Sequence, residues 1–146
     1  MRRLHLFEFN DIEACPKPFR DSVVETLGRG LRWSNLGDII GPSFKAFAER
    51  TGSKRVLDLC SGTAEPVSIL LNWLKKDAGQ GRIPHFLVSD LFPNLACFRK
   101  ATKLLPGDVS AVEEPVNALG VDGGIEHDTR TIINAFHHFP PDLARG

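Results

Sequence analysis

The chain has 146 residues, and its 18 basic residues balance 18 acidic ones. A chain of this length forms one domain, and its neutral charge argues against nonspecific binding to nucleic acids or acidic membranes. No apolar run reaches membrane-spanning length, and the N-terminus lacks the apolar core and cleavage site of a signal peptide. We therefore expect a cytoplasmic, single-domain protein over residues 1–146 that binds neither nucleic acid nor membranes.

The first 52 residues are expected to form a helical extension of the domain. Residues 1–9 combine alternating polar and apolar residues with a local apolar cluster, and they predict either a strand or a packed arm. Residues 17–33 predict a helix because apolar side chains recur every four positions on one face: Phe19, Val23, Leu27 and Leu31. A shorter helix is expected over residues 43–50, with Ser43 as N-cap, Phe44 and Phe47 facing inward, and Gly52 as terminator.

From residue 53 onward, short apolar runs alternate with helical patterns. Helices are expected over residues 66–76 and 94–105, and strands over residues 55–60, 85–90, part of 108–115, and 130–136. This alternation predicts an α/β fold with a Rossmann-like parallel sheet, right-handed crossovers and helices on both faces.

The residues that follow the first two strands are the candidates for binding a ligand. In open parallel sheets, ligands bind beyond the carboxyl ends of the strands. The first strand is followed by Asp58 and the small-residue turn 60–64, and the second strand ends at Asp90. Small residues allow a sharp turn close to a ligand, and the next helix presents free amide groups.

The charge at this turn disfavours a phosphate ligand. If the G-x-G-x-x-G fingerprint is aligned on Gly62, Cys60 replaces the first glycine and Glu65 the third, and glutamate repels a pyrophosphate. No G-x-x-x-x-G-K-[ST] loop is present either. Nicotinamide, flavin and ATP therefore fit poorly, and a nicotinamide-dependent oxidoreductase is the least favoured hypothesis. S-adenosylmethionine fits better, because carboxylates attract its sulfonium and ammonium groups and Asp90 can accept hydrogen bonds from ribose hydroxyls.

Four segments resemble, in order, the motifs of class I S-adenosylmethionine-dependent methyltransferases. They are VLDLCSGTAEP, VSDLFPN, EEPVNAL and TIINAFHHFP, which together extend from about residue 55 to residue 141. The resemblance implies a strand order of 3-2-1-4 within a family sheet of seven strands. It also implies S-adenosylmethionine as the cofactor and methyl transfer to an unknown acceptor, for which NAFHHF favours a small molecule.

The resemblance assigns roles to the acidic and amide residues at the strand ends. Asp58 would orient the turn and bond near the methionine amino group, while Asp90 would hold the ribose and Leu91 would flank the adenine. Asn117 stands where the family often has an aspartate that contacts the adenine amino group, and an amide carbonyl can accept the same hydrogen bond. The alternative is that Asp58 and Asp90 are ordinary turn residues.

The remaining residues of the implied site lie in the two turns. Cys60, Ser61 and Gly62 would pack against the cofactor, and Asn134 and Ala135 would line the path towards the sulfonium. Cys60 and Ala64 replace two of the three glycines of the family motif, for which we expect a cost in crowding.

His137 and His138 are the candidate general bases, because histidine titrates near neutral pH. If they follow a strand, adjacent side chains point in opposite directions and at most one can face the site. A structural or solvated histidine pair is the alternative. The histidines include no pair at helical ligand spacing and the three cysteines are widely spaced, so no metal site is expected.

The chain ends about one turn into the helix that follows the fourth strand. Relative to the family, strands five to seven are then missing, and the fourth strand becomes an edge. An apolar edge strand is a template for pairing, so we expect a homodimer or other oligomer that covers TIINAF. The alternative to an active methyltransferase is a truncated, non-catalytic relative that binds the cofactor or acts through association.

Overall fold

The computed structural model describes residues 15–77 and 82–139. Helices α1 (Lys17–Arg32) and α2 (Leu36–Thr51) precede β1 (Arg55–Leu59), α3 (Glu65–Asp77), β2 (His85–Val88), α4 (Leu95–Leu104), β3 (Val109–Ala111), β4 (Thr129–Ile132) and a 3-10 turn (Phe136–His138). The strand or arm expected over residues 1–9 lies outside the described residues.

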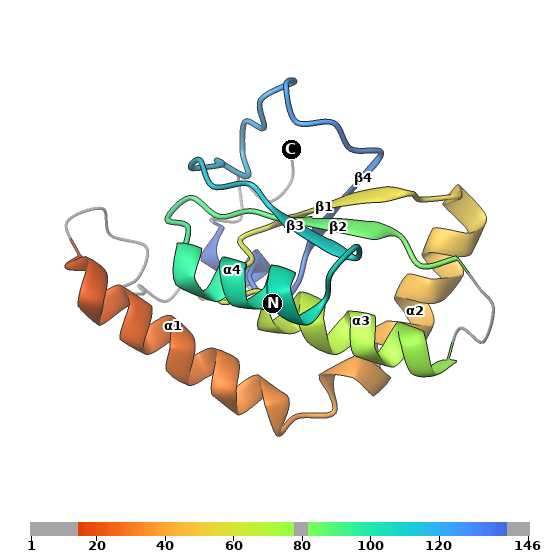
Figure 1. Ribbon diagram of the computed structural model, residues 1–146, viewed down its shortest axis with the longest axis horizontal. Coiled ribbons are helices and arrows are strands. Elements are labelled where there is room, and N and C mark those ends of the chain that lie inside the picture. The colour runs from red at the N-terminus through yellow and green to blue at the C-terminus, as the bar shows by residue number, and fades with distance from the viewer. Residues whose placement is uncertain (1–14, 78–81, 140–146) are drawn as a thin grey trace, which may run out of the picture.

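The four strands form one parallel sheet in the order β3-β2-β1-β4 (Figure 1). The expected Rossmann-like α/β architecture is therefore confirmed. In the register of the sheet, Asp58 of β1 lies beside Val88 of β2 on one side and Thr131 of β4 on the other. The carboxyl ends of the central strands consequently meet at the turns that follow β1 and β2.

The helices of the described chain gather on one face of the sheet (Figure 1). Both crossovers, β1 to β2 and β2 to β3, step in the same direction, and right-handed crossovers then put α3 and α4 on the same side. The opposite face is covered by the irregular segment 112–128, which packs on Leu57, Leu59 and Leu87. The fold differs here from the expectation of helices on both faces.

Helix α1 has nearly the expected bounds but buries a different face. Phe19 and Leu27 were expected to point inward, yet they are 54% and 57% exposed. Arg20 and Gly28 are buried instead. The buried row is shifted by one residue, and it packs on the turns after β1 and β2, while the helix also contacts α3.

Helix α2 is longer than expected, and the prediction of Ser43 as its N-cap is wrong. The helix begins at Leu36 and contains Pro42, although proline removes an internal hydrogen bond. It is held against α3 by Trp73, whose Nε1 donates a 3.0 Å hydrogen bond to Asp38. Tertiary packing outweighs the local proline signal here. The C-terminal prediction holds, because Gly52 ends the helix in the left-handed conformation with φ 67°.

Strand β4 ends earlier than the expected residues 130–136. Asn134 takes a left-handed conformation with φ 58°, which turns the chain away from the sheet. Residues 136–138 then form a 3-10 turn, so His137 and His138 do not follow a continuous strand. The argument that the two side chains alternate across a strand therefore fails.

No helix in the described ranges is long and apolar enough to cross a membrane.

Candidate functional site

Asp58 forms the centre of a buried hydrogen-bond network at the end of β1. The residue is 1% exposed. Its Oδ2 accepts a 2.6 Å hydrogen bond from the Ser61 hydroxyl, and its Oδ1 accepts one of 2.8 Å from the Thr131 hydroxyl. The carboxylate thus ties the turn after β1 to the neighbouring strand β4.

Ser61 and Ser89 extend this network across the sheet. The Ser61 amide donates to the Ser89 carbonyl at 2.9 Å, while the Ser89 hydroxyl donates to the Asp58 carbonyl at 2.8 Å. Both serines are buried. The ends of β1 and β2 are therefore cross-linked by hydrogen bonds, which fixes the two turns relative to each other.

Burial raises the pKa of Asp58 to about 7, from an ordinary value of 3.8. The hydrogen bonds from Ser61 and Thr131 oppose this rise, and the nearby charge of Asp90 adds to it. Near neutral pH the carboxyl group consequently exchanges between its neutral and ionised forms. A nearby cation would favour the ionised form.

The turn after β1 has positive φ at alternate residues. Cys60, Gly62 and Ala64 have φ of 58°, 55° and 59°. They occupy the positions at which the motif that the sequence resembles has glycines. Two of them carry side chains, so the turn holds backbone strain of about 1 kcal/mol or more at each of these two residues.

Asp90 closes over this turn from the end of β2. Its Oδ2 accepts a 2.9 Å hydrogen bond from the Gly62 amide, and its Oδ1 accepts one of 3.0 Å from the Phe92 amide. Asp58 and Asp90 therefore flank the same turn, as the sequence predicted. The carboxylate of Asp90 is half-buried and binds backbone donors, which leaves lone pairs that can accept further hydrogen bonds.

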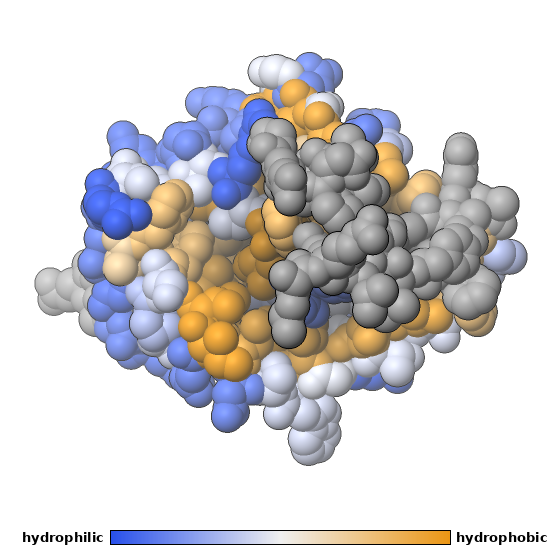
Figure 2. All heavy atoms as spheres, turned by 180° about the vertical axis from the view of Figure 1, so that it is seen from behind, coloured by the Kyte–Doolittle hydropathy of each residue, from blue (hydrophilic) through white to orange (hydrophobic). Residues whose placement is uncertain are grey.

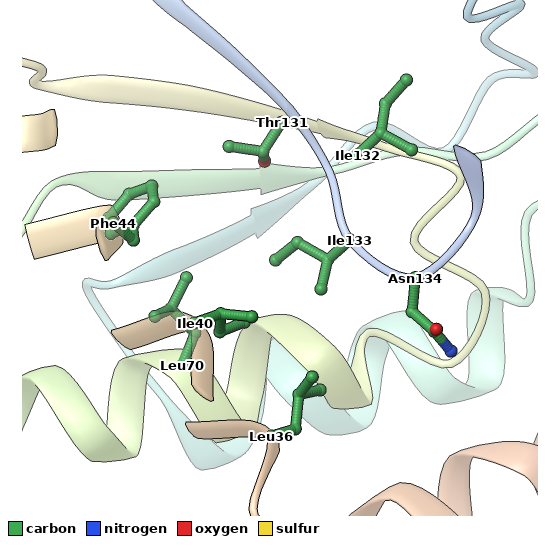
Figure 3. Close-up of a pocket in the computed structure, with 8 residues that line it drawn as sticks. All are labelled: Leu36, Ile40, Phe44, Leu70, Thr131, Ile132, Ile133 and Asn134. Atoms are coloured by element: carbon green, nitrogen blue, oxygen red, sulfur yellow. The ribbon is translucent and has the colours of Figure 1, made fainter. Parts of the chain in front are cut away.

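An apolar hollow lies beside this turn, between the free side of β4 and the helices α2 and α3. Its volume is about 380 Å³, and it is lined by Leu36, Ile40, Phe44, Leu70, Thr131, Ile132, Ile133 and Asn134 (Figure 3). On the back of the molecule, hydrophobic atoms gather around a depression (Figure 2). Thr131 belongs to both features, because it lines the hollow and bonds to Asp58.

The other predicted site residues lie around these two features. Leu91 is exposed next to Asp90, and the Val116 amide donates to the Asp90 carbonyl at 2.9 Å, which brings the segment after β3 to the site. Asn117 follows on that segment, and its Oδ1 already accepts a hydrogen bond from the Leu119 amide. Asn134 is exposed and Ala135 is buried.

The histidines remain unassigned as catalytic groups. His137 is exposed, and the side chain of His138 lies outside the described residues. In the part of the chain that the structure describes, no group of three or more histidine, cysteine or acidic residues could hold a metal ion. All three cysteines are free thiols.

Sequence reasoning missed several residues that build the site. Thr131 and Ser89 were not singled out, although polar residues in apolar strands are a signal of buried hydrogen bonding. Arg20 and Val24 of α1, which cover the turns, gave no comparable signal.

Comparisons of the chain with protein-family models, curated proteins and solved structures find no match.

Proposed function

We propose that the chain binds S-adenosylmethionine at the turns after β1 and β2 and acts as a methyltransferase. One observation carries the proposal: two carboxylates, Asp58 and Asp90, flank a turn with three left-handed residues at the carboxyl edge of a parallel sheet. An acidic turn of this kind suits a cationic nucleoside better than a phosphate.

The residues present are chemically compatible with this cofactor. Gly62 keeps the turn free of a side chain at its middle position, and Asp90 has acceptor capacity left for ribose hydroxyls. A cation bound nearby would favour the ionised form of Asp58. The residues of the turn therefore fit the group that the sequence motifs imply.

The bound cofactor supplies an electrophilic methyl group on its sulfonium. The chain would contribute binding and orientation, which is the main requirement for an in-line transfer. Asp90 would hold the ribose, and Asp58 would keep the turn in place through Ser61. The acceptor would be a small molecule, and the apolar hollow beside Thr131 and Asn134 is where its apolar part would lie.

Calorimetric titration with S-adenosylmethionine and S-adenosylhomocysteine tests this proposal. We expect micromolar binding that Asp90→Ala weakens at least about tenfold, since the ribose contact and the closed turn are both lost. Asp77→Ala is the matched control, because this exposed acid pairs with Lys45 at the far end of α3. Absence of binding at millimolar ligand would exclude the methyltransferase and its non-catalytic alternative together. Binding of the cofactor without methylation of small-molecule acceptors would favour the non-catalytic alternative.

We also propose that two copies of the chain pair through β4. In the described sheet, β4 pairs with β1 alone, so its other edge presents backbone donors and acceptors without a neighbouring strand. An antiparallel arrangement centred on Thr129 would place the Arg130 of each copy beside the Asp128 of the other. The carboxylate of Asp128 accepts hydrogen bonds from the Lys54 and Arg55 amides through Oδ2, which leaves Oδ1 to attract the arginine across the strand pair.

Light scattering across a concentration series tests the pairing. We expect a dimer that Arg130→Glu weakens and that Lys103→Glu, an exposed charge reversal on α4, leaves intact. A monomer at every concentration would rule this arrangement out.

A further inference from the structure

We propose that helix α1 is a displaceable cover over the ligand site, so that closing the helix and binding a ligand compete. The inference rests on the proposed function for the identity of the ligand. Its structural basis is one row of residues on α1 that contacts the turns after β1 and β2. The row consists of Arg20, Val24 and Gly28.

Gly28, the last member of this row, lies directly on the turn after β1. A Cβ placed on Gly28 would overlap the hydroxyl of Thr63, so α1 comes as close to the turn as a glycine permits. Val24 is the next member of the row, and its Cγ1 lies 3.1 Å from the position of a Cβ on Gly62. Gly62 is the central left-handed residue of the turn. Val24 therefore occupies the surface that the missing side chain of Gly62 leaves open to a ligand.

The first member of the row covers the turn after β2. The guanidinium of Arg20 stacks on the ring of Phe92 with its Cζ 3.8 Å from the ring centroid. Arg20 is 9% exposed, which is unusual for arginine. Phe92 lies two residues beyond Asp90, and its amide bonds to the Asp90 carboxylate. The guanidinium of Arg20 thus covers the ring face of Phe92, the aromatic residue that bonds to the proposed ribose-binding acid Asp90.

Outside this row, α1 contacts α3 but leaves large apolar side chains exposed. Phe19 and Leu27 are more than half exposed, and Trp33, which follows the helix, is 91% exposed. Among the described residues, neither hydrophobic core cluster includes a side chain of α1, so the helix can separate from the turns without unfolding the sheet. Residues 33–35 between α1 and α2 lie outside both helices and are the place where the chain can bend.

Competition has a quantitative consequence. If only a fraction of molecules is open, the apparent dissociation constant is the intrinsic one divided by that fraction. A substitution that weakens the α1 contact, without touching the site itself, should therefore strengthen ligand binding. A helix that merely forms the wall of the site predicts the reverse, because its loss removes contacts to the ligand.

The test compares Gly28→Val with Gly30→Val. Both put a β-branched residue into α1, but a side chain at Gly30 meets no atom within 4 Å, whereas one at Gly28 strikes Thr63. We expect Gly28→Val to bind S-adenosylhomocysteine about threefold tighter or more than Gly30→Val. Val24→Ala, which removes the Cγ1 contact with Gly62 without introducing a clash, should shift the affinity in the same direction. Equal or weaker binding by both Gly28→Val and Val24→Ala overturns the proposal.

Hydrogen exchange separates this inference from the proposed function. In the ligand-free wild type, the α1 amides should exchange much faster than those of β1, and Gly28→Val should accelerate them further. Exchange of α1 as slow as that of β1 overturns the cover whatever the ligand. Rapid α1 exchange in a protein that binds neither S-adenosylmethionine nor S-adenosylhomocysteine overturns the ligand assignment and, with it, the competition. Added ligand should increase α1 exchange in the wild type.

Discussion

Thr131 and Asp58 are partners in the register of β4 and β1, and the Thr131 hydroxyl donates a 2.8 Å hydrogen bond to the Asp58 carboxylate. The bond joins residues that are 73 positions apart in the chain. Because Asp58 is fully buried, the ionisation of one carboxyl group is coupled to the junction of the two strands and to the turn after β1. Stability, ligand binding and pH should therefore be linked through Asp58.

The contribution of Asp58 to stability should fall as pH rises towards 7. Folding raises the pKa of Asp58 from 3.8 to about 7 because burial disfavours the charged form. Below pH 4 the group is protonated in both states and its contribution is fully present. Between these values only the unfolded chain loses the proton, so stability declines by about 1.4 kcal/mol per pH unit and levels off above the folded pKa.

Urea unfolding at pH 5 and pH 8 measures this contribution when wild type and Asp58→Asn are compared. We expect the wild type to lose about 3 kcal/mol more than the variant over this interval, since asparagine does not ionise. Parallel stability profiles of the two proteins would show that Asp58 keeps an ordinary pKa.

Cofactor binding near pH 7 should release a proton. At this pH the folded Asp58 is about half protonated, and a cation bound nearby favours its ionised form. Binding of S-adenosylmethionine should then release up to about half a proton, and affinity should increase with pH through this range. Calorimetry in buffers of different ionisation enthalpy directly gives the number of protons released on binding. The same release in Asp58→Asn would assign the proton to another group.

Replacing Cys60 by glycine should stabilise the fold. Cys60 has φ 58°, a conformation that glycine adopts without steric cost. Cys60→Ala serves as the control, because it removes the thiol and keeps the strain. We expect Cys60→Gly to be more stable than Cys60→Ala by about 0.5 to 1 kcal/mol in chemical unfolding, after the entropy of glycine in the unfolded chain is included. Greater stability of the alanine variant would mean that the turn relaxes.

A methyl group at position 41 should destabilise the contact of α2 with α3. A Cβ on Gly41 would overlap the indole of Trp73, and a Cβ on Gly37 would lie 3.2 Å from the Cβ of the same residue. Gly41→Ala should cost about 1 to 3 kcal/mol as Trp73 is forced to move. Gly30→Ala, in the open part of α1, should gain up to about 1 kcal/mol from helix propensity. A neutral result at position 41, measured by thermal unfolding, would show that α2 shifts freely.

The local pattern of the sequence determined which segments form the sheet and which acidic residues lie at its carboxyl edge. Alternation of apolar runs with amphipathic stretches predicted each strand and helix after residue 53, because burial of an apolar face depends mainly on residue spacing. The proximity of the acids at the ends of β1 and β2 could also be predicted from the sequence. Parallel strands bring their carboxyl ends to a common edge, so Asp58 and Asp90 had to lie near each other.

Only the tertiary structure decided which partners those residues meet. The buried row of α1, the course of α2 through Pro42 and the bond from Thr131 to Asp58 depend on side chains that are distant in the sequence. Hydrophobic spacing specifies that a face is buried but not against which neighbour. An arginine on phenylalanine, or a glycine against threonine or tryptophan, is settled by shape and distance once the sheet has formed.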